Sequence, residues 1–399
     1  WLKIAGLPTI AVREIVVQKR HNDLVLATFG RGVYIVDDYS PLRAATLEMT
    51  QQPATLLGAR DAMLYVPTQK YGGRGKSFQG EMLYAADNPP YGAVITYHLK
   101  ESLKTLKQKR VDAEKAAEKA GKTIEYPSFD AMRAEAEEEA PAILLTISDE
   151  AGAPIRTITG PASAGFQRVA WDLRLPLHTL PRTPRPGGDE DDFFGNQSGP
   201  YAIPGAYRVS MAQRVGGVVT PLGGPVSFKV FADPKSPLSL ADHKARGEFQ
   251  TAYQALRRSV AGALEVANAT NTRLDQLKRA LDGTPAAPRA LHDSVRGAQK
   301  RLGAILIALR GDTAIAQRSE GTPDSISDRV NGIGFEQSRT LAPATGTHRG
   351  QVEIAKSLFA DELGKLKTLV ETDIPVLERD AEAAGAPWTV GRIPTLREP

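Results

Sequence analysis

The densest group of potential metal ligands in the sequence is an acidic run within a stretch rich in proline and glycine. Asp189, Asp191 and Asp192 offer the hard carboxylate oxygens that Ca²⁺ prefers. Their spacing lacks the alternating ligands and the distal glutamate of an EF-hand loop. Because a run of like charges usually faces water, we expect a solvated acidic loop, with a Ca²⁺ site at these three aspartates as the alternative.

Other patterns that could support catalysis are incomplete. Tyr71 to Ser77 ends like a phosphate-binding loop, but Lys70 stands where that loop needs its first glycine. The six histidines show neither i, i+4 pairing nor H-E-x-x-H spacing, and no G-x-S-x-G elbow is present. The sequence has no cysteine, which excludes thiolate metal sites and cysteine nucleophiles. We therefore predict a protein that is not an enzyme and that holds no cofactor.

Two adjacent aromatic residues, Phe193 and Phe194, follow the acidic run directly. Exposed aromatic side chains in loops often anchor a protein partner. The same pair could equally pack beneath the neighbouring domain. We take both residues as candidate partner-binding residues.

A second candidate contact surface is basic. Basic residues outnumber acidic residues between positions 240 and 310, and they include the adjacent pairs Arg257 with Arg258 and Lys300 with Arg301. Such a surface could contact an acidic protein or anionic lipid headgroups. An ordinary solvated face of a helical bundle is the alternative.

A carbohydrate site would need either paired carboxylates across a cleft or an aromatic stacking platform. Asp37 and Asp38 are adjacent acids, but they fall at the end of a strand, where turn acceptors are common. Trp171 shares one face of an alternating strand with Val169 and Leu173, which is typical of a core residue. Its alternative role is a platform for a sugar ring.

The bulk composition excludes several classes of protein. The 399 residues carry 50 basic and 46 acidic side chains, and a net charge of +4 is too small and too scattered for a nucleic-acid-binding surface. No apolar run is long enough to span a bilayer, so the chain is not expected to cross a membrane itself. The chain begins at Trp1 without a leader pattern, so we expect that an upstream part has been removed.

The elements that must position any site begin with strands. Residues 12–18, 24–29 and 33–38 alternate β-branched with polar residues, and the turns between them are short. Residues 1–45 therefore predict a short antiparallel sheet, and residues 46–92 a linker with short strands. Three strands alone are marginally stable, so this sheet must pack on another part of the chain or on a partner.

Residues 93–235 predict an immunoglobulin- or fibronectin-III-like β-sandwich, because six further strand patterns follow at sandwich-like spacing. A helical insertion at 100–140 and a loop at 176–204 interrupt it. The expected strands are 93–99, 142–148, 155–159, 166–173, 206–211 and 226–231.

The last third of the sequence predicts an antiparallel helical bundle over 239–382, followed by an extended tail at 383–399. Apolar residues recur in alternating steps of four and three along 249–281, 291–309 and 359–370, which indicates three long helices. Pro375 should end or kink the third of them.

Several short motifs resemble a known family. The segments 7–13 (LPTIAVR), 22–32 (NDLVLATFGRG) and 37–42 (DDYSPL) look like the closing blade of secreted bacterial proteins with sortilin-type (VPS10-like) β-propellers. These proteins are often labelled glycosyl-hydrolase-like with BNR repeats. The segments 88–93 (NPPYGA) and 171–174 (WDLR) resemble the part that follows the propeller.

The sequence departs from that family because no Asp-box turn of the type S-x-D-x-G-x-T-W is present, so most of the propeller and its central funnel are missing. The resemblance therefore implies a truncated relative. We expect a non-catalytic, periplasmic or secreted scaffold that docks onto protein partners, as an extrinsic subunit of a larger envelope or membrane-bound complex. The alternative is a carbohydrate-binding or glycoside-hydrolase-like protein, or a processed fragment of one.

Overall fold

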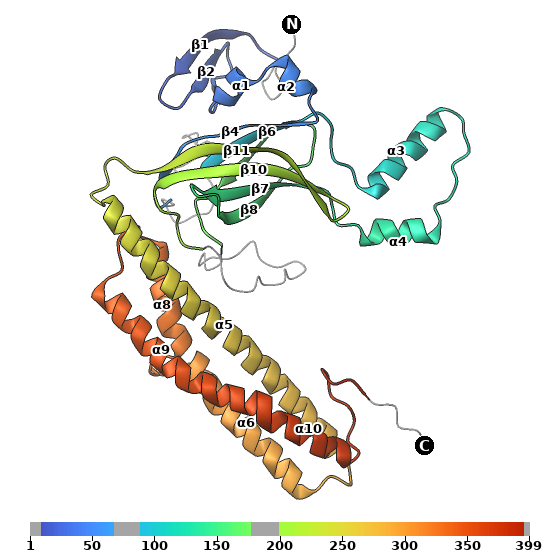
Figure 1. Ribbon diagram of the computed structural model, residues 1–399, viewed down its shortest axis with the longest axis vertical. Helices are drawn as coiled ribbons and strands as arrows, with labels where there is room; N and C mark the ends of the chain where they lie inside the picture. Colours follow the sequence, from blue (N-terminus) through green and yellow to red (C-terminus); the bar gives the residue numbers. More distant parts are fainter. Residues whose placement is uncertain (1–8, 68–87, 177–198, 395–399) are drawn as a thin grey trace. The chain divides into compact units, whose positions relative to one another are not determined.

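The computed structural model describes residues 9–67, 88–176 and 199–394. They form two compact units, one rich in β-strands and one helical (Figure 1). The β-rich unit takes the described residues up to 175 together with 202–236, and the helical unit takes the others. The order of β-structure followed by α-structure is therefore as the sequence predicts.

The β-rich unit begins with a three-stranded antiparallel sheet in the order β1-β2-β3. Its strands are β1 (Val12–Gln18), β2 (Asp23–Thr28) and β3 (Val33–Val36). Val25 on β2 pairs with Val16 on one side and with Ile35 on the other, so these three side chains share a face. Val16 is 50% exposed and Ile35 59%, whereas Leu26, which points to the opposite face, is buried. The sheet thus leaves one apolar face open to solvent.

Two larger sheets follow. One has five strands in the order β5-β11-β10-β7-β8, and the other has three in the order β4-β6-β9. The strands are β4 (Ala54–Ala59), β5 (Ala62–Leu64), β6 (Ala93–Leu99), β7 (Ala142–Asp149), β8 (Pro154–Gly160), β9 (Gly165–Trp171), β10 (Gly205–Val215) and β11 (Val218–Ala232). All six strands expected for the sandwich are present, and the last two are longer than their patterns indicated. Gly216 and Gly217, both at positive φ, form the two-residue turn that lets β10 and β11 continue as a long hairpin.

The segment expected to be a linker contributes to both of these sheets. After two short helices, α1 (Ser40–Ala44) and α2 (Leu47–Gln51), β4 pairs antiparallel with β6. β5 then pairs parallel with the end of β11. Residues 46–67 therefore supply one strand to each sheet, a long-range pairing that the local pattern does not reveal.

The core of the β-rich unit is aromatic and aliphatic. Trp171 is fully buried, and its ring centroid lies 5.2 Å from that of Tyr207 and 6.1 Å from that of Phe228. The indole N–H donates to the carbonyl of Arg174 at 2.9 Å, so its polar atom is satisfied. Burial removes Trp171 from consideration as a sugar-stacking platform.

The helical unit contains the bundle that the heptad-like spacing predicts. Its helices are α5 (Leu240–Asp282), α6 (Arg289–Arg310), α7 (Thr313–Ala316), α8 (Ile326–Ser338), α9 (Gly346–Lys367), η1 (Thr368–Asp373) and α10 (Ile374–Ala383). Every expected seam residue of α5 is buried except Phe249, which is half-buried, and all six of α6 are buried. In the third run, Phe359 and Leu366 are buried, while Leu363 and Val370 are half-buried.

The bundle contains more helices than the expected three. The short α7 and α8 are additional, and Ile326, Val330 and Ile333 of α8 pack into the same core. α8 was not predicted because its pattern is short and contains Gly332 and Gly334, which lower helix propensity. The third helix is interrupted at Pro375, as expected: the π-helical turn η1 ends at Asp373, and Pro375 stands in the first turn of α10.

Gly334 lies against a buried tyrosine and provides a test of this packing. The Tyr253 hydroxyl donates to the carbonyl of Val330 at 2.7 Å, and a Cβ at position 334 would lie 2.5 Å from that hydroxyl oxygen. We expect Gly334→Ala to destabilise the helical unit by about 2 kcal/mol through overpacking. In a Tyr253→Phe background the clash disappears, so the same substitution should stabilise by up to about 1 kcal/mol through helix propensity.

Urea unfolding of the four proteins in this double-mutant cycle measures the effect. Tyr253 stays neutral across the accessible pH range because burial raises its pKa to about 12, so its hydroxyl remains a donor throughout. Gly303→Ala on α6, where nothing lies within 4 Å of the added carbon, is the matched control and should not depend on residue 253. Additive effects at 253 and 334 would contradict the packing described here.

Candidate functional site

The insertion between β6 and β7 forms a pair of helices, α3 (Leu106–Lys119) and α4 (Phe129–Glu137), where the sequence predicts a helical insertion. Figure 1 shows them on the same excursion from the β-rich unit. Thr105 and Gln108 form a capping box at the start of α3, and the Ser128 side chain accepts from the backbone N–H of Ala131 at the start of α4. Neither helix has a buried residue, so packing against a core does not hold them together.

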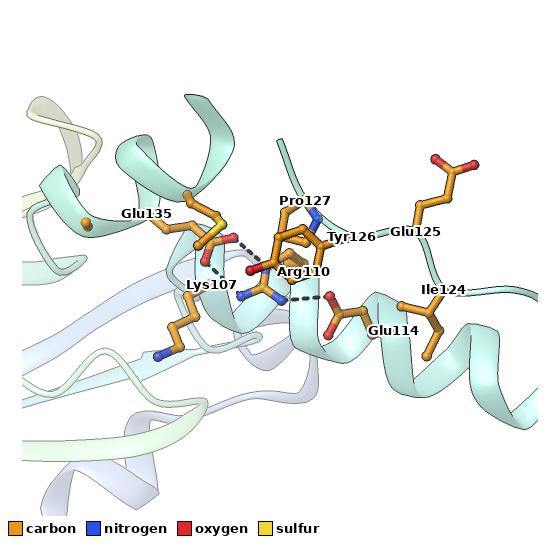
Figure 2. A pocket seen from close by; sticks show the side chains of 10 residues that line it. Lys107, Arg110, Glu114, Ile124, Glu125, Tyr126, Pro127 and Glu135 are labelled. Atoms are coloured by element: carbon orange, nitrogen blue, oxygen red, sulfur yellow. Dashed lines mark hydrogen bonds and ion pairs between the residues drawn. The ribbon is translucent and has the colours of Figure 1, made fainter. Parts of the chain in front are cut away.

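Arg110 joins the two helices instead. Its Nε lies 2.6 Å from Oε1 of Glu135 on α4, and its second terminal nitrogen lies 2.9 Å from Oε2 of the same carboxylate. The remaining nitrogen donates to Glu114 at 2.7 Å, so all sides of the guanidinium are occupied (Figure 2). The hydrogen bonds from Arg110 lower the pKa of Glu135, and the two carboxylates raise the pKa of Arg110. Such a bidentate pair fixes relative orientation as well as adding energy.

Further polar contacts hold the base of the excursion. The backbone N–H of Leu106 donates to the Glu138 carboxylate at 2.6 Å, which joins the start of α3 to the end of α4. Glu139 pairs with Arg214 of β10 at 2.8 Å. The excursion is therefore an ordered element, held by charge-assisted hydrogen bonds at its base and along its length.

The connection between the two helices presents apolar side chains to solvent. Tyr126 is 81% exposed and Phe129 83%, and Ile124 and Met132 are also exposed. Tyr126, Ile124 and Met132 line a hollow of about 580 Å³ beside Arg110, which Figure 2 shows from close by. Arg110 engages the carboxylates of Glu114 and Glu135, and Lys107 and Glu125 also line the hollow. The exposed apolar side chains beside these charged groups make it a candidate contact surface.

The sequence carries a signal for this surface in the contrast between two aromatic residues and their surroundings. Tyr126 and Phe129 stand within a segment otherwise rich in lysine, glutamate and alanine, with few apolar residues nearby on which to pack. That mismatch is the signal that could have identified Tyr126 and Phe129.

The candidates in the proline- and glycine-rich loop lie outside the described residues. These are the three aspartates proposed for Ca²⁺, Asp189, Asp191 and Asp192, and the aromatic pair Phe193 and Phe194. The segment 71–77, considered as a phosphate-binding loop, also lies outside them.

The two basic pairs do not meet on one surface. Gln299 on α6 donates to Asp275 on α5 at 2.7 Å, so Lys300 and Arg301 are nearly level with position 274. Arg257 and Arg258 lie about 16 residues closer to the start of α5. At a rise of 1.5 Å per residue, this separates the two pairs by roughly 24 Å along the helix axis. Arg301 is also paired with Asp373 at 2.9 Å, although its side chain remains 60% exposed.

The remaining titratable candidates lie in a strand-end turn or inside the helical unit. Asp38 is buried and accepts from the backbone N–H and the hydroxyl of Ser40, as expected for a turn acceptor. His348 contacts Glu336 at 2.6 Å inside the helical unit. His243 is buried, and desolvation lowers its pKa. In the part of the chain that the structure describes, no three potential metal-ligating side chains come together.

Comparisons with known proteins add little to this description. No protein-family model and no curated protein sequence matches the chain. A solved structure titled "pT26-6p" is 12% identical, with a TM-score of 0.14; the match covers 62% of this chain and 42% of that one. The chain thus spans less than half the length of that structure. Among the described helices, none is both long and apolar enough to cross a membrane.

Proposed function

We propose that the protein is a non-catalytic scaffold that docks onto a protein partner through the α3–α4 excursion. The observation that carries this proposal is the exposure of Tyr126 and Phe129 on a helix pair that has no core of its own. Single exposed hydrophobic residues are ordinary, but two aromatics that are more than four-fifths exposed and close together in sequence are not. Aromatic residues of this kind are the usual anchors of protein interfaces.

The expected partner is a protein surface with two apolar pockets whose edges are basic. Glu125 precedes Tyr126, and Asp130 follows Phe129 with a side chain that is 94% exposed. These acids would meet lysine or arginine on the partner, which sets the orientation of docking more than its strength. Arg110 contributes by holding both helices in place before binding, which reduces the ordering entropy that docking requires.

The wider setting remains that of an extracytoplasmic, periplasmic or secreted extrinsic subunit of a larger envelope or membrane-bound complex. The resemblance to proteins with sortilin-type propellers motivates this part of the proposal. The open apolar face around Val16 and Ile35 supports it, because exposed apolar surface often marks a place where a protein partner binds. An immunoglobulin-like assignment for the sandwich belongs to the same proposal.

The carbohydrate-binding alternative has lost the residue that motivated it. Trp171 is fully buried, so it cannot stack on a sugar ring. We therefore carry forward only the docking proposal.

Site-specific photo-cross-linking tests the docking proposal. A benzophenone amino acid is placed at position 126 or 129 in cells that make the protein natively, with position 47 as the control, where Leu47 is 85% exposed on α2. We expect one common cross-linked protein from positions 126 and 129 and none from position 47. Recovery of the protein only at its monomer mass, or equal products from all three positions, would overturn the proposal.

A double substitution at the same two residues gives the quantitative prediction. Tyr126→Ala with Phe129→Ala should lower the amount of co-purified partner by about tenfold or more, because interface anchors cost about 2 kcal/mol or more when truncated. Folding stability should change by less than about 0.5 kcal/mol, since both side chains face solvent. A retained partner, measured by quantitative mass spectrometry after affinity purification, would contradict the assignment of these anchors.

A further inference from the structure

A second hollow, of about 390 Å³, lies within the helical unit. We call it the α6–α9 groove, since α6 and α9 form its walls and α7 and the start of α8 close one end. The two wall helices are antiparallel. Arg301, near the middle of α6, contacts Asp373, which lies beyond the end of α9. Ile307, near the end of α6, lines the groove together with Leu358, which lies earlier in α9.

The floor of the groove is apolar and open to solvent. Ile307 is 49% exposed, Ile315 38% and Leu358 44%. Ile354, one turn before Leu358 on α9, is 46% exposed and extends the same row. These residues do not belong to the bundle core. α6 and α9 contribute other side chains, such as Leu309 and Phe359, to that core. Both helices therefore present a second apolar face around one hollow.

The edge of the groove is acidic. Four carboxylates and one ammonium group line the groove. The carboxylates belong to Asp312, Asp324, Asp361 and Glu362, and the ammonium group belongs to Lys365. Lys365 is paired with Glu362 at 2.7 Å and also interacts with the charge of Asp361, so this one ammonium offsets only part of the charge of the four carboxylates. Asp324 lies 3.9 Å from Arg329, which is a long contact for an ion pair. A local negative charge stands out in a chain whose net charge is +4.

We infer that the α6–α9 groove binds a cationic amphipathic helix from a protein partner. A groove between two antiparallel helices accepts a third helix, whose anchors at i and i+4 match the spacing of Ile354 and Leu358. Lysine or arginine beside those anchors would meet Asp361, Asp312 and Asp324. The same carboxylates repel anionic lipid headgroups, so charge complementarity favours a basic peptide over a membrane surface.

Fluorescence anisotropy with designed peptides tests this inference on the full chain. The probe is a labelled helix of about 18 residues with a leucine and isoleucine face and a lysine face. We expect it to bind at least about tenfold more tightly than a scrambled peptide of the same composition, and a peptide with glutamate in place of lysine should not bind. Raising the salt concentration from about 0.05 to 0.5 M should weaken binding several-fold, because screening shortens the reach of the carboxylates.

Variants locate the binding on the groove. Ile307→Ser with Leu358→Ser should weaken binding of the cationic peptide by about tenfold or more, whereas Val266→Ser, at an apolar site on α5 that is 45% exposed, should leave it unchanged. Asp361→Lys should weaken it similarly, with Glu265→Lys on α5 as the charge-matched control. All five positions are exposed, so the fold should be retained, and circular dichroism checks this.

The result distinguishes this inference from the docking function proposed for the excursion. Tyr126→Ala with Phe129→Ala should leave peptide binding unchanged, because the two surfaces belong to different units. Equal binding of the scrambled peptide, or binding that the groove variants do not weaken, would overturn the inference. Neither outcome would alter the cross-linking result at positions 126 and 129.

Discussion

Replacing Gly92 by alanine is expected to destabilise the β-rich unit by about 4 kcal/mol, among the largest effects a single added methyl group can have. Gly92 precedes β6, and the first residue of that strand, Ala93, pairs with Trp171 at the end of β9. A Cβ at position 92 would lie 1.8 Å from the carbonyl oxygen of Trp171. That oxygen belongs to backbone, so no side-chain rotation can relieve the overlap. The residue also has φ of +111°, a conformation that side chains disfavour.

A matched control separates the clash from the backbone strain. Gly152, in the turn between β7 and β8, has φ of +92° and nothing within 4 Å of an added Cβ. Gly152→Ala should therefore cost only about 1–2 kcal/mol, the part that arises from positive φ. Hydrogen exchange in peptides from β6 and β9, followed through urea unfolding, reports on this unit without interference from the helical one. Similar losses for the two variants would show that the strands separate to accommodate the methyl group.

Local periodicity predicted the parts of the fold that depend on neighbours in sequence. The seam of α5 could be listed residue by residue, because a buried stripe on a long helix repeats at fixed steps over many turns. The β6 strand was predicted with its observed bounds, 93–99, since its apolar residues alternate between two turn-rich flanks. In both cases the same short-range pattern decides the element and the buried face.

Long-range pairing lies outside what such patterns can predict. The three-residue strand β5 has its partner, the end of β11, more than 160 residues away, and nothing in its own residues indicates a parallel pair. α8 was missed for a related reason, since Gly332 and Gly334 weaken its local signal while contacts with α5, α6 and α9 stabilise it. Tertiary packing decides both elements.

The candidate sites show the same limit. The sequence predicts a helical insertion at 100–140, but it could not tell which of its residues face solvent. It gave no indication of the α6–α9 groove, because that surface draws residues from four separate helices. Conversely, Arg257 and Arg258 were grouped with Lys300 and Arg301 by composition, and the antiparallel packing of α5 and α6 separates them. Which residues share a surface depends on which helices and strands pack together, and amino-acid composition does not contain that information.

One ion pair with a buried carboxylate helps to hold the end of the chain on the bundle. Arg273 on α5 contacts both carboxylate oxygens of Glu378 on α10, each at 2.5 Å, and the Glu378 side chain is only 5% exposed. Arg392 donates to the backbone carbonyl of Glu378 at 3.0 Å and pairs with Glu382 at 2.7 Å. The terminal segment therefore contacts the same turn of α10. Arg392 also approaches the Glu378 carboxylate, but only to 3.8 Å.

Replacing Arg273 by methionine is expected to destabilise the helical unit by about 3 kcal/mol. The substitution keeps most of the side-chain volume but leaves a buried carboxylate without its bidentate partner, which costs far more than the net value of the pair. Arg273→Lys should recover only part of the loss, since a single ammonium cannot bridge both oxygens. Urea unfolding followed by helical circular dichroism measures the change, and hydrogen exchange in α10 should report the largest local effect.

The decisive comparison is the double substitution of Arg273 and Glu378 by methionine. If an unpaired buried charge causes the loss, removing both charges should restore stability to within about 1 kcal/mol of the starting protein, because apolar side chains of similar volume replace a buried pair well. Lys356→Met is the control for ordinary ion pairs, since Lys356 and Glu353 are exposed and 3.6 Å apart, and it should change stability by less than about 0.5 kcal/mol. A double variant as unstable as Arg273→Met would instead mean that the pair contributes directed hydrogen bonds that packing cannot replace. In that case the docking of α10 and the terminal segment onto α5 would depend on the geometry of Arg273, rather than on the absence of a buried charge.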